Sequence, residues 1–140
     1  ALFICRSGEN GPEVSNLAAG GLFPWSPTWG EINYLAYDMP TVDLHNELYG
    51  RLQELTEHWS IPRFDNYLVE QGIQKNKQWR EERGGVPREP YDVTLMTFIR
   101  HKIHHPENAT MQGQEYTQDE LRSSIESMIA LLNQIENGEE

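Results

Sequence analysis

The chain has 140 residues, with 22 acidic and 11 basic side chains and a formal net charge of −11. That length suits a single domain that buries its own core, so we treat residues 1–140 as one domain. The single cysteine, Cys5, excludes an intramolecular disulfide framework and fits a reducing compartment, so we expect a cytoplasmic protein. No apolar run is long enough to cross a bilayer, and we expect no membrane partner.

Residues 1–40 form the first segment, which we predict to be an irregular N-terminal arm. Glycine and proline recur throughout it and break any long element. Aromatic side chains are too frequent there for a free linker, so the arm should lie on the rest of the domain, on a partner, or on both. Phe23, Trp25 and Trp29 would suit stacking on RNA bases, although simple packing explains the same rings better.

Residues 41–136 form the predicted helical body, which begins with two helices. The first covers residues 41–59, because bulky apolar side chains recur at steps of three and four residues after a capping threonine. His45 and His58 lie near its ends and are expected at the surface or its boundary. The second helix covers about residues 63–77 and is weakened at Gly72.

Residues 74–89 are strongly polar and contain a Gly-Gly pair, which predicts a long exposed connection. Lys77, Arg80 and Arg83 make this connection basic. Between them, Trp79 would suit a stacking platform for a base, but an anchor that pins the connection to the body is the better interpretation. Residues 71–105 carry seven basic and four acidic side chains, which makes them the only net-positive third of the chain.

Residues 91–103 are predicted to form the third helix, with an apolar stripe at helical spacing. Pro106 disfavours the helical conformation at the preceding residue, so the helix should end at or just before His105. The last turn and its exit hold Arg100, His101, Lys102, His104 and His105. Arg100 and His104 lie on one line of the helix and His101 and His105 on the next, so this end presents a cationic, titratable edge.

The last helix is predicted over residues 117–135. Thr117 and Glu120 form a capping box at its start. Five apolar side chains then recur at alternating steps of four and three, the spacing of a bundle helix or a coiled-coil seam. The predicted fold is therefore all-α, a helical bundle of about four main helices with an irregular N-terminal arm.

The arginine and histidine pattern, Arg100-His101 followed three residues later by His105, resembles the R-polar-x3-H signature of the HEPN superfamily. A loop and a long amphipathic helix follow the motif, as they do in that superfamily of small helical domains. The resemblance covers about residues 85–136. It implies a prokaryotic ribonuclease of the toxin-antitoxin or phage-defence type, whose two copies pair so that both motifs line one cleft.

The chemistry of these side chains suits metal-independent RNA cleavage. Imidazole titrates near neutral pH and can move protons to and from the 2′-OH and the leaving oxygen. Guanidinium stabilises the charged phosphorus centre. By the resemblance, Arg100 would bind phosphate, His105 would transfer protons and His101 would assist, with His104 as an additional candidate. Lys77, Arg80, Arg83 and Lys102 would bind the substrate, and neither cofactor nor metal is expected.

Two other interpretations of the motif remain open. His101 and His105 have the spacing that lets two imidazoles bind one Zn²⁺ from a helix, with Glu107 as a third ligand, but the general-base glutamate of the usual motif is absent between them. Alternatively, the cations only complement the negative end of the helix dipole, and the domain is a non-catalytic binding module in a larger assembly. The acidic total of the chain favours this second alternative, because polyanion binding needs basic side chains. Expected partners are RNA, a second copy of the chain, and an antitoxin or larger protein.

Overall fold

The computed structural model describes residues 3–8, 11–16, 22–24, 26, 28–108, 111 and 113–138. Its helices are α2 (Trp29–Tyr37), α3 (Val42–Thr56), α4 (Ile61–Glu70), α5 (Leu95–His104) and α6 (Gln118–Gly138). Its strands are β1 (Phe3–Gly8), β2 (Gly11–Asn16), β3 (Lys77–Trp79), β4 (Glu82–Arg83), β5 (Val86–Pro87) and β6 (Tyr91–Val93). Among these residues no helix is both long and apolar enough to cross a membrane.

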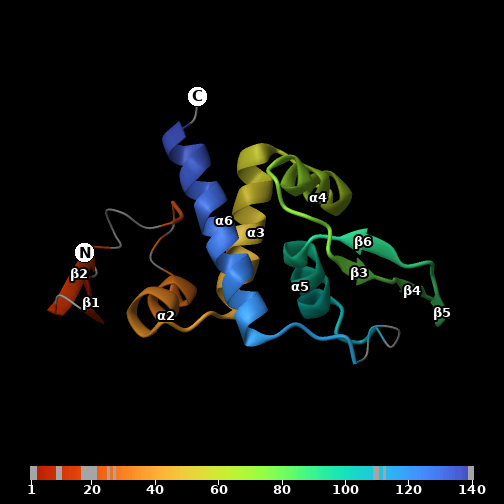
Figure 1. Cartoon of the computed structure of the whole chain (residues 1–140), viewed down its shortest axis with the longest axis horizontal. Helices are drawn as coiled ribbons and strands as arrows, with labels where there is room; N and C mark the ends of the chain where they lie inside the picture. Colours follow the sequence, from red (N-terminus) through yellow and green to blue (C-terminus); the bar gives the residue numbers. More distant parts are fainter. Residues whose placement is uncertain are drawn as a thin grey trace.

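The fold is α+β, so the prediction of an all-α bundle is wrong. Short strands form the antiparallel pairs β1–β2, β3–β6 and β4–β5. The strands β3 to β6 have two or three residues each, too few for an alternating pattern to be read from the sequence, and β3 pairs with a strand more than ten residues away. The strands beside α5 lie on the opposite side of the molecule from β1 and β2 (Figure 1).

The described part of the N-terminal arm contains regular elements, which also corrects the prediction of an irregular arm. β1 and β2 pair antiparallel, with Gly8 opposite Gly11. Helix α2 follows and begins with a capping box, in which Thr28 accepts from the Glu31 N–H and the Glu31 carboxylate accepts from the Thr28 N–H. The same buried carboxylate accepts from the Leu22 N–H at 2.7 Å, so it fixes the chain entering the helix.

The core lies between α3, α5 and α6, and α3 runs beside α6 through the middle of the molecule (Figure 1). The capping box predicted for α6 is confirmed, with Thr117 and Glu120 exchanging two bonds of 3.0 Å. The apolar side chains of α6 that recur at helical spacing are buried in this core: Leu121, Ile125, Met128 and Leu132. The seam therefore packs within the chain and leaves no need for a second copy to cover it.

The two helices predicted before the basic segment are shorter than expected. α3 ends at Thr56, where Glu57 takes a left-handed conformation, and Trp59 is 67% exposed instead of packing inward. α4 ends before Gly72, which has a φ of +97°. The expectation that His45 lies at the surface or its boundary is wrong, because its side chain is fully buried and bonds Ser124 at 2.7 Å.

The helix predicted over residues 91–103 begins later, at Leu95. Thr94 caps it by accepting from the Thr97 N–H, and the preceding residues form β6, which pairs with β3. Its predicted end is confirmed, because the last helical residue is His104. The predicted long connection before it instead contains the three short strands β3, β4 and β5, with a tight turn at Gly84 and Gly85, both at positive φ.

Candidate functional site

The end of α5 packs against β3 through two aromatic rings. The His101 imidazole stacks on the Trp79 indole, with ring centroids 4.8 Å apart and an interplanar angle of 26°. Trp79 is 1% exposed, so it is the anchor that the sequence favoured and not an open stacking platform. This contact fixes the strands of the basic segment against the last turn of α5.

His105 follows the last turn of α5 and remains accessible. Its N–H donates to the His101 carbonyl at 2.8 Å, which places its side chain beside that of His101. The two imidazole centroids are 6.0 Å apart. The His105 Nδ1 lies 3.6 Å from a carboxylate oxygen of Glu107, and the His105 side chain is 51% exposed. A ligand can therefore reach His105, whereas His101 is largely covered.

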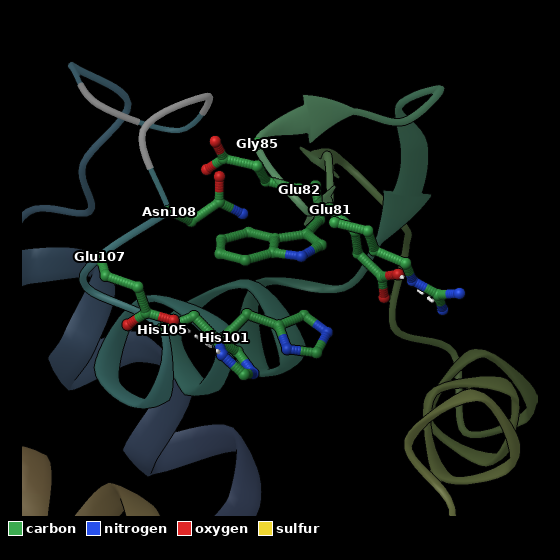
Figure 2. A pocket seen from close by; sticks show the side chains of 9 residues that line it. Glu81, Glu82, Gly85, His101, His105, Glu107 and Asn108 are labelled. Atoms are coloured by element: carbon green, nitrogen blue, oxygen red, sulfur yellow. Dashed lines mark hydrogen bonds and ion pairs between the residues drawn. The ribbon is translucent and has the colours of Figure 1, made fainter.

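A pocket of about 380 Å³ opens between the end of α5 and the β4–β5 hairpin. His101 and His105 form one wall, and Glu82, Gly85 and Asn108 lie opposite them (Figure 2). The pocket is lined by Trp79, Glu81, Glu82, Arg83, Gly85, His101, His105, Glu107 and Asn108. Three carboxylates against one guanidinium make this lining acidic. The sequence did not single out Glu81 or Glu82 as site residues, because chain order does not reveal that the hairpin folds back toward α5.

The burial of His101 changes its chemistry. Desolvation, and after it the nearby His105 and Arg100, lower its pKa to about 4, while Glu81 and Asp65 oppose the shift. His101 is therefore neutral at pH 7 and carries one acceptor nitrogen. Burial, then Arg100 and then His105 also lower the pKa of the exposed His104. The end of α5 thus carries less positive charge than its sequence suggests.

Arg100 does not line the pocket that holds His101 and His105. Its guanidinium lies over the Tyr49 ring, 5.4 Å from the centroid. The Tyr49 hydroxyl bonds the Thr97 hydroxyl at 2.9 Å, and Thr97 in turn donates to Asp65 at 2.6 Å. Arg100 therefore packs on the Tyr49 ring, and a buried hydrogen-bond network holds that ring in place.

Asp65 organises that network, and sequence reasoning missed it. Its buried carboxylate accepts from the Thr94 hydroxyl at 2.6 Å, from the Thr94 N–H and from Thr97. Lys75 lies 3.7 Å from its second oxygen. Its position in the sequence could have indicated this burial, because Asp65 directly follows Phe64 and lies three residues before Leu68, on the inward face of α4.

The side chains predicted to bind substrate are dispersed. Lys77 pairs with Glu120 at 2.7 Å, and Lys102 pairs with Glu115 at 3.1 Å and donates to the Met111 carbonyl. Arg83 alone among them lines the pocket, where it contacts Glu81 at 3.5 Å. The Arg80 carbonyl accepts from the Asn108 amide at 2.8 Å, which ties the loop after α5 to the strands. Of these four residues, only Arg83 lines the pocket with His101 and His105.

The aromatic side chains of the N-terminal segment are also separated. Phe23 is buried in the core, whereas Trp29 is 79% exposed. Trp25 lies outside the described residues. The zinc interpretation has no geometric support in the described part of the chain, where no three histidine, cysteine or acidic side chains are placed to hold a metal ion.

A comparison of the chain with protein-family models, curated proteins and solved structures finds no match. The HEPN resemblance therefore rests on the motif at the end of α5 and on the helix that follows it. Any functional conclusion must come from the geometry of these residues.

Proposed function

We propose that the chain is a metal-independent endoribonuclease that acts in the cytoplasm, with the end of α5 as its reaction centre. The proposal rests on the environment of the Arg100 guanidinium. Within the described residues it makes no ion pair with a carboxylate, and it lies one helical turn before His104, on the face of α5 adjacent to that of the accessible His105. An uncompensated guanidinium beside imidazoles is suited to bind a phosphate whose neighbouring hydroxyl is activated.

The roles of the motif side chains follow from their environments. Arg100 binds the scissile phosphate and stabilises the charge on phosphorus, and His105 moves protons between the 2′-OH and the leaving 5′-oxygen. The 2′-oxygen attacks phosphorus and the 5′-oxygen leaves, which produces a 2′,3′-cyclic phosphate. His101 is a poor general base with a pKa of about 4, so it positions His105 through packing. His104 is the second imidazole available for proton transfer.

A second copy of the chain is part of the proposal, because one chain divides the motif between two surfaces. Arg100 lies over Tyr49, whereas His105 lines the pocket on the adjacent face of α5. A pair of chains meeting at their α5 ends would let the arginine of one copy face the histidine of the other. Since the α6 seam is buried within each chain, the α5 ends are the surfaces proposed to meet.

The ion pairs that Lys77 and Lys102 make with glutamates oppose RNA binding only weakly. Ion pairs at a protein surface contribute about 0–1 kcal/mol, so a phosphate can replace a carboxylate partner. Glu115, the partner of Lys102, is 64% exposed in its side chain and is free to move into solvent. We propose that Lys77 and Lys102 exchange these carboxylates for the RNA backbone.

The test is cleavage of a mixture of structured and single-stranded RNA in excess EDTA. Wild type should cut and leave 2′,3′-cyclic phosphate ends, and Arg100→Ala and His105→Ala should each lower the rate at least about a hundredfold. Arg63→Ala, at an exposed arginine of α4, is the matched control and should cut like wild type. Circular dichroism must show that every variant is folded. Undiminished cleavage in either motif variant would refute the proposal.

A non-catalytic binding module within a larger assembly is the second candidate, and one observation favours it. The pocket beside His105 is lined by Glu81, Glu82 and Glu107, which repel a phosphate. In that case a folded wild-type protein leaves every RNA intact in the same assay. An antitoxin or a larger protein would then be the partner to seek.

A further inference from the structure

Helix α2 and the residues that lead into α3 expose an unusual amount of apolar surface. Half of the eight large hydrophobic side chains that are exposed in the described residues lie between positions 29 and 42. Trp29, the first residue of α2, is the most exposed of them at 79%, and the others in this stretch are Tyr37, Met39 and Val42. Exposed apolar surface that is concentrated in this way is typical of a site that binds another molecule.

A groove of about 780 Å³ lies between the first turn of α2 and the first turns of α3. Trp29 and Ile32 line it from α2. Gly30 sets the distance between the two helices, because a Cβ atom at this position would lie only 3.0 Å from the Cβ of Leu44. The volume falls in the range of about 300–1,000 Å³ that is typical of ligand sites.

The α3 wall of this groove is negatively charged, and no lysine or arginine is among its described lining residues. Asp43 and Glu47 line it one helical turn apart, and the Asp43 carboxylate makes no hydrogen bond or ion pair within the described residues. The Thr28 hydroxyl donates to one oxygen of Glu47 at 2.9 Å and so fixes this side chain in the wall. Burial raises the pKa of Glu47, and the nearby Glu31 and Asp43 act in the same direction against the bond from Thr28. A cation in the groove would offset this negative charge.

We propose that the groove docks a linear segment of a partner protein that carries basic side chains beside apolar ones. The apolar side chains would pack on Trp29 and Ile32, and a basic side chain would face Asp43 and Glu47. An indole is also the aromatic ring that attracts a cation most strongly. Because α2 has nine residues and is about 13 Å long, covering its exposed side chains requires a segment of several residues rather than a small cation.

Other occupants match the groove less well. A second copy of the chain brings a net charge of −11, and RNA or an anionic membrane brings phosphates, all of which the two carboxylates repel. The described residues also contain no group of three side chains that could hold a metal ion. The sign of the charge therefore favours a basic protein segment.

This groove lies apart from the residues proposed to cleave RNA. α2 and α5 lie on opposite sides of the α3–α6 pair (Figure 1), and no residue of the arginine and histidine motif lines the groove. Docking is therefore independent of the proposed nuclease function. Trp29→Ala should leave RNA cleavage unchanged, so failure of one proposal is distinguishable from failure of the other.

Three peptides test the charge and the apolar requirement separately. The probe is acetyl-Leu-Arg-Leu-Arg-Leu-amide, and the controls are the same peptide with glutamate in place of arginine and the same peptide with glycine in place of leucine. Binding is followed in NMR titrations by the indole N–H signal of Trp29, assigned by its loss in Trp29→Phe. We expect the probe to shift this signal with a dissociation constant of about 1 mM or tighter, and to bind at least about tenfold more tightly than either control.

Substitutions locate the site, with backbone amide signals of α2 and α3 as the readout. Trp29→Ala should weaken the probe about tenfold, and Glu47→Gln, which keeps an acceptor for Thr28, should weaken it about threefold to fivefold. Trp59→Ala and Glu70→Gln remove an exposed indole and an exposed carboxylate elsewhere and should leave the affinity unchanged.

Several results would overturn the proposal. They are an unshifted Trp29 signal with the arginine peptide, equal affinities for the three peptides, and equal effects of the groove and control substitutions. A Trp29 signal that responds to single-stranded RNA would assign the surface to nucleic acid instead. A signal that shifts when the protein concentration alone is raised would assign it to a second copy of the chain.

Discussion

The buried His45 makes folding sensitive to acid, and the structure gives the size of the effect. Burial without a charged partner lowers its pKa from 6.5 to about 3. Protonation therefore favours the unfolded chain, in which the ordinary pKa returns. The free energy of unfolding is unaffected by this group above pH 6.5 and falls as the pH drops from 6.5 towards 3.

The magnitude follows from the interval between the two pKa values. Each pH unit inside it removes about 1.4 kcal/mol, so the drop from pH 6.5 to pH 5 costs about 2 kcal/mol. That is a substantial part of the stability of about 5–15 kcal/mol that is typical of a single domain. This figure is the contribution of His45 alone, whose side chain is fully buried and whose bond to Ser124 is uncharged; His101, with a pKa of about 4, adds a loss of its own.

Urea unfolding of wild type and His45→Gln between pH 7.5 and 5 measures the effect. Glutamine keeps a polar group within reach of Ser124 but does not titrate in this range. The stability lost between the two pH values should be about 2 kcal/mol smaller in the variant. The difference between the variants isolates His45, since every other histidine titrates in both proteins. An identical pH dependence in the two would refute the assignment of a depressed pKa to His45.

The other predictions concern the supports of the site. Asp65→Ala removes the acceptor for Thr94 and Thr97, and should lower the free energy of unfolding by about 2–4 kcal/mol in urea titrations at pH 7.5. Asp65→Asn keeps one acceptor oxygen and should cost less; an equal loss would contradict the hydrogen-bond explanation. Trp79→Ala opens a cavity and should cost about 3–5 kcal/mol. The same change exposes the His101 ring, whose pKa should rise from about 4 towards 6.5 in an NMR titration, and an unchanged pKa would show that burial is not its cause.

Long periodic elements were predictable because their signals are local. The capping box and the apolar spacing of α6 lie within one continuous stretch, and both are present in the structure. The end of α5 was also predictable, since Pro106 acts on the residue directly before it. In these cases neighbouring residues alone determine the conformation.

The strands beside α5 were not predicted, because strand pairing depends on residues that are distant in sequence. The residues of β6 were predicted to form the first turn of the helix, and only their pairing with Trp79 and its neighbours makes them a strand. That same pairing buries Trp79 against His101 and thereby lowers the pKa of His101. The sequence predicted a cationic, titratable edge that includes all three histidines, whereas the tertiary contacts make His101 buried and neutral.

The division of the last turn of α5 between two surfaces follows from helical geometry. Consecutive side chains are about 100° apart, so Arg100 and His104 turn to one side and His101 and His105 to the next. α3 contributes Tyr49 on the first side and the strands contribute carboxylates on the second, which gives the two sides different electrostatic character. Arg100→Ala should therefore remove the cation on the first side and leave the acidic second side unchanged. His105 lines the acidic second side and is half-exposed, so its proposed proton transfer depends on how far a second copy of the chain brings an arginine toward that side.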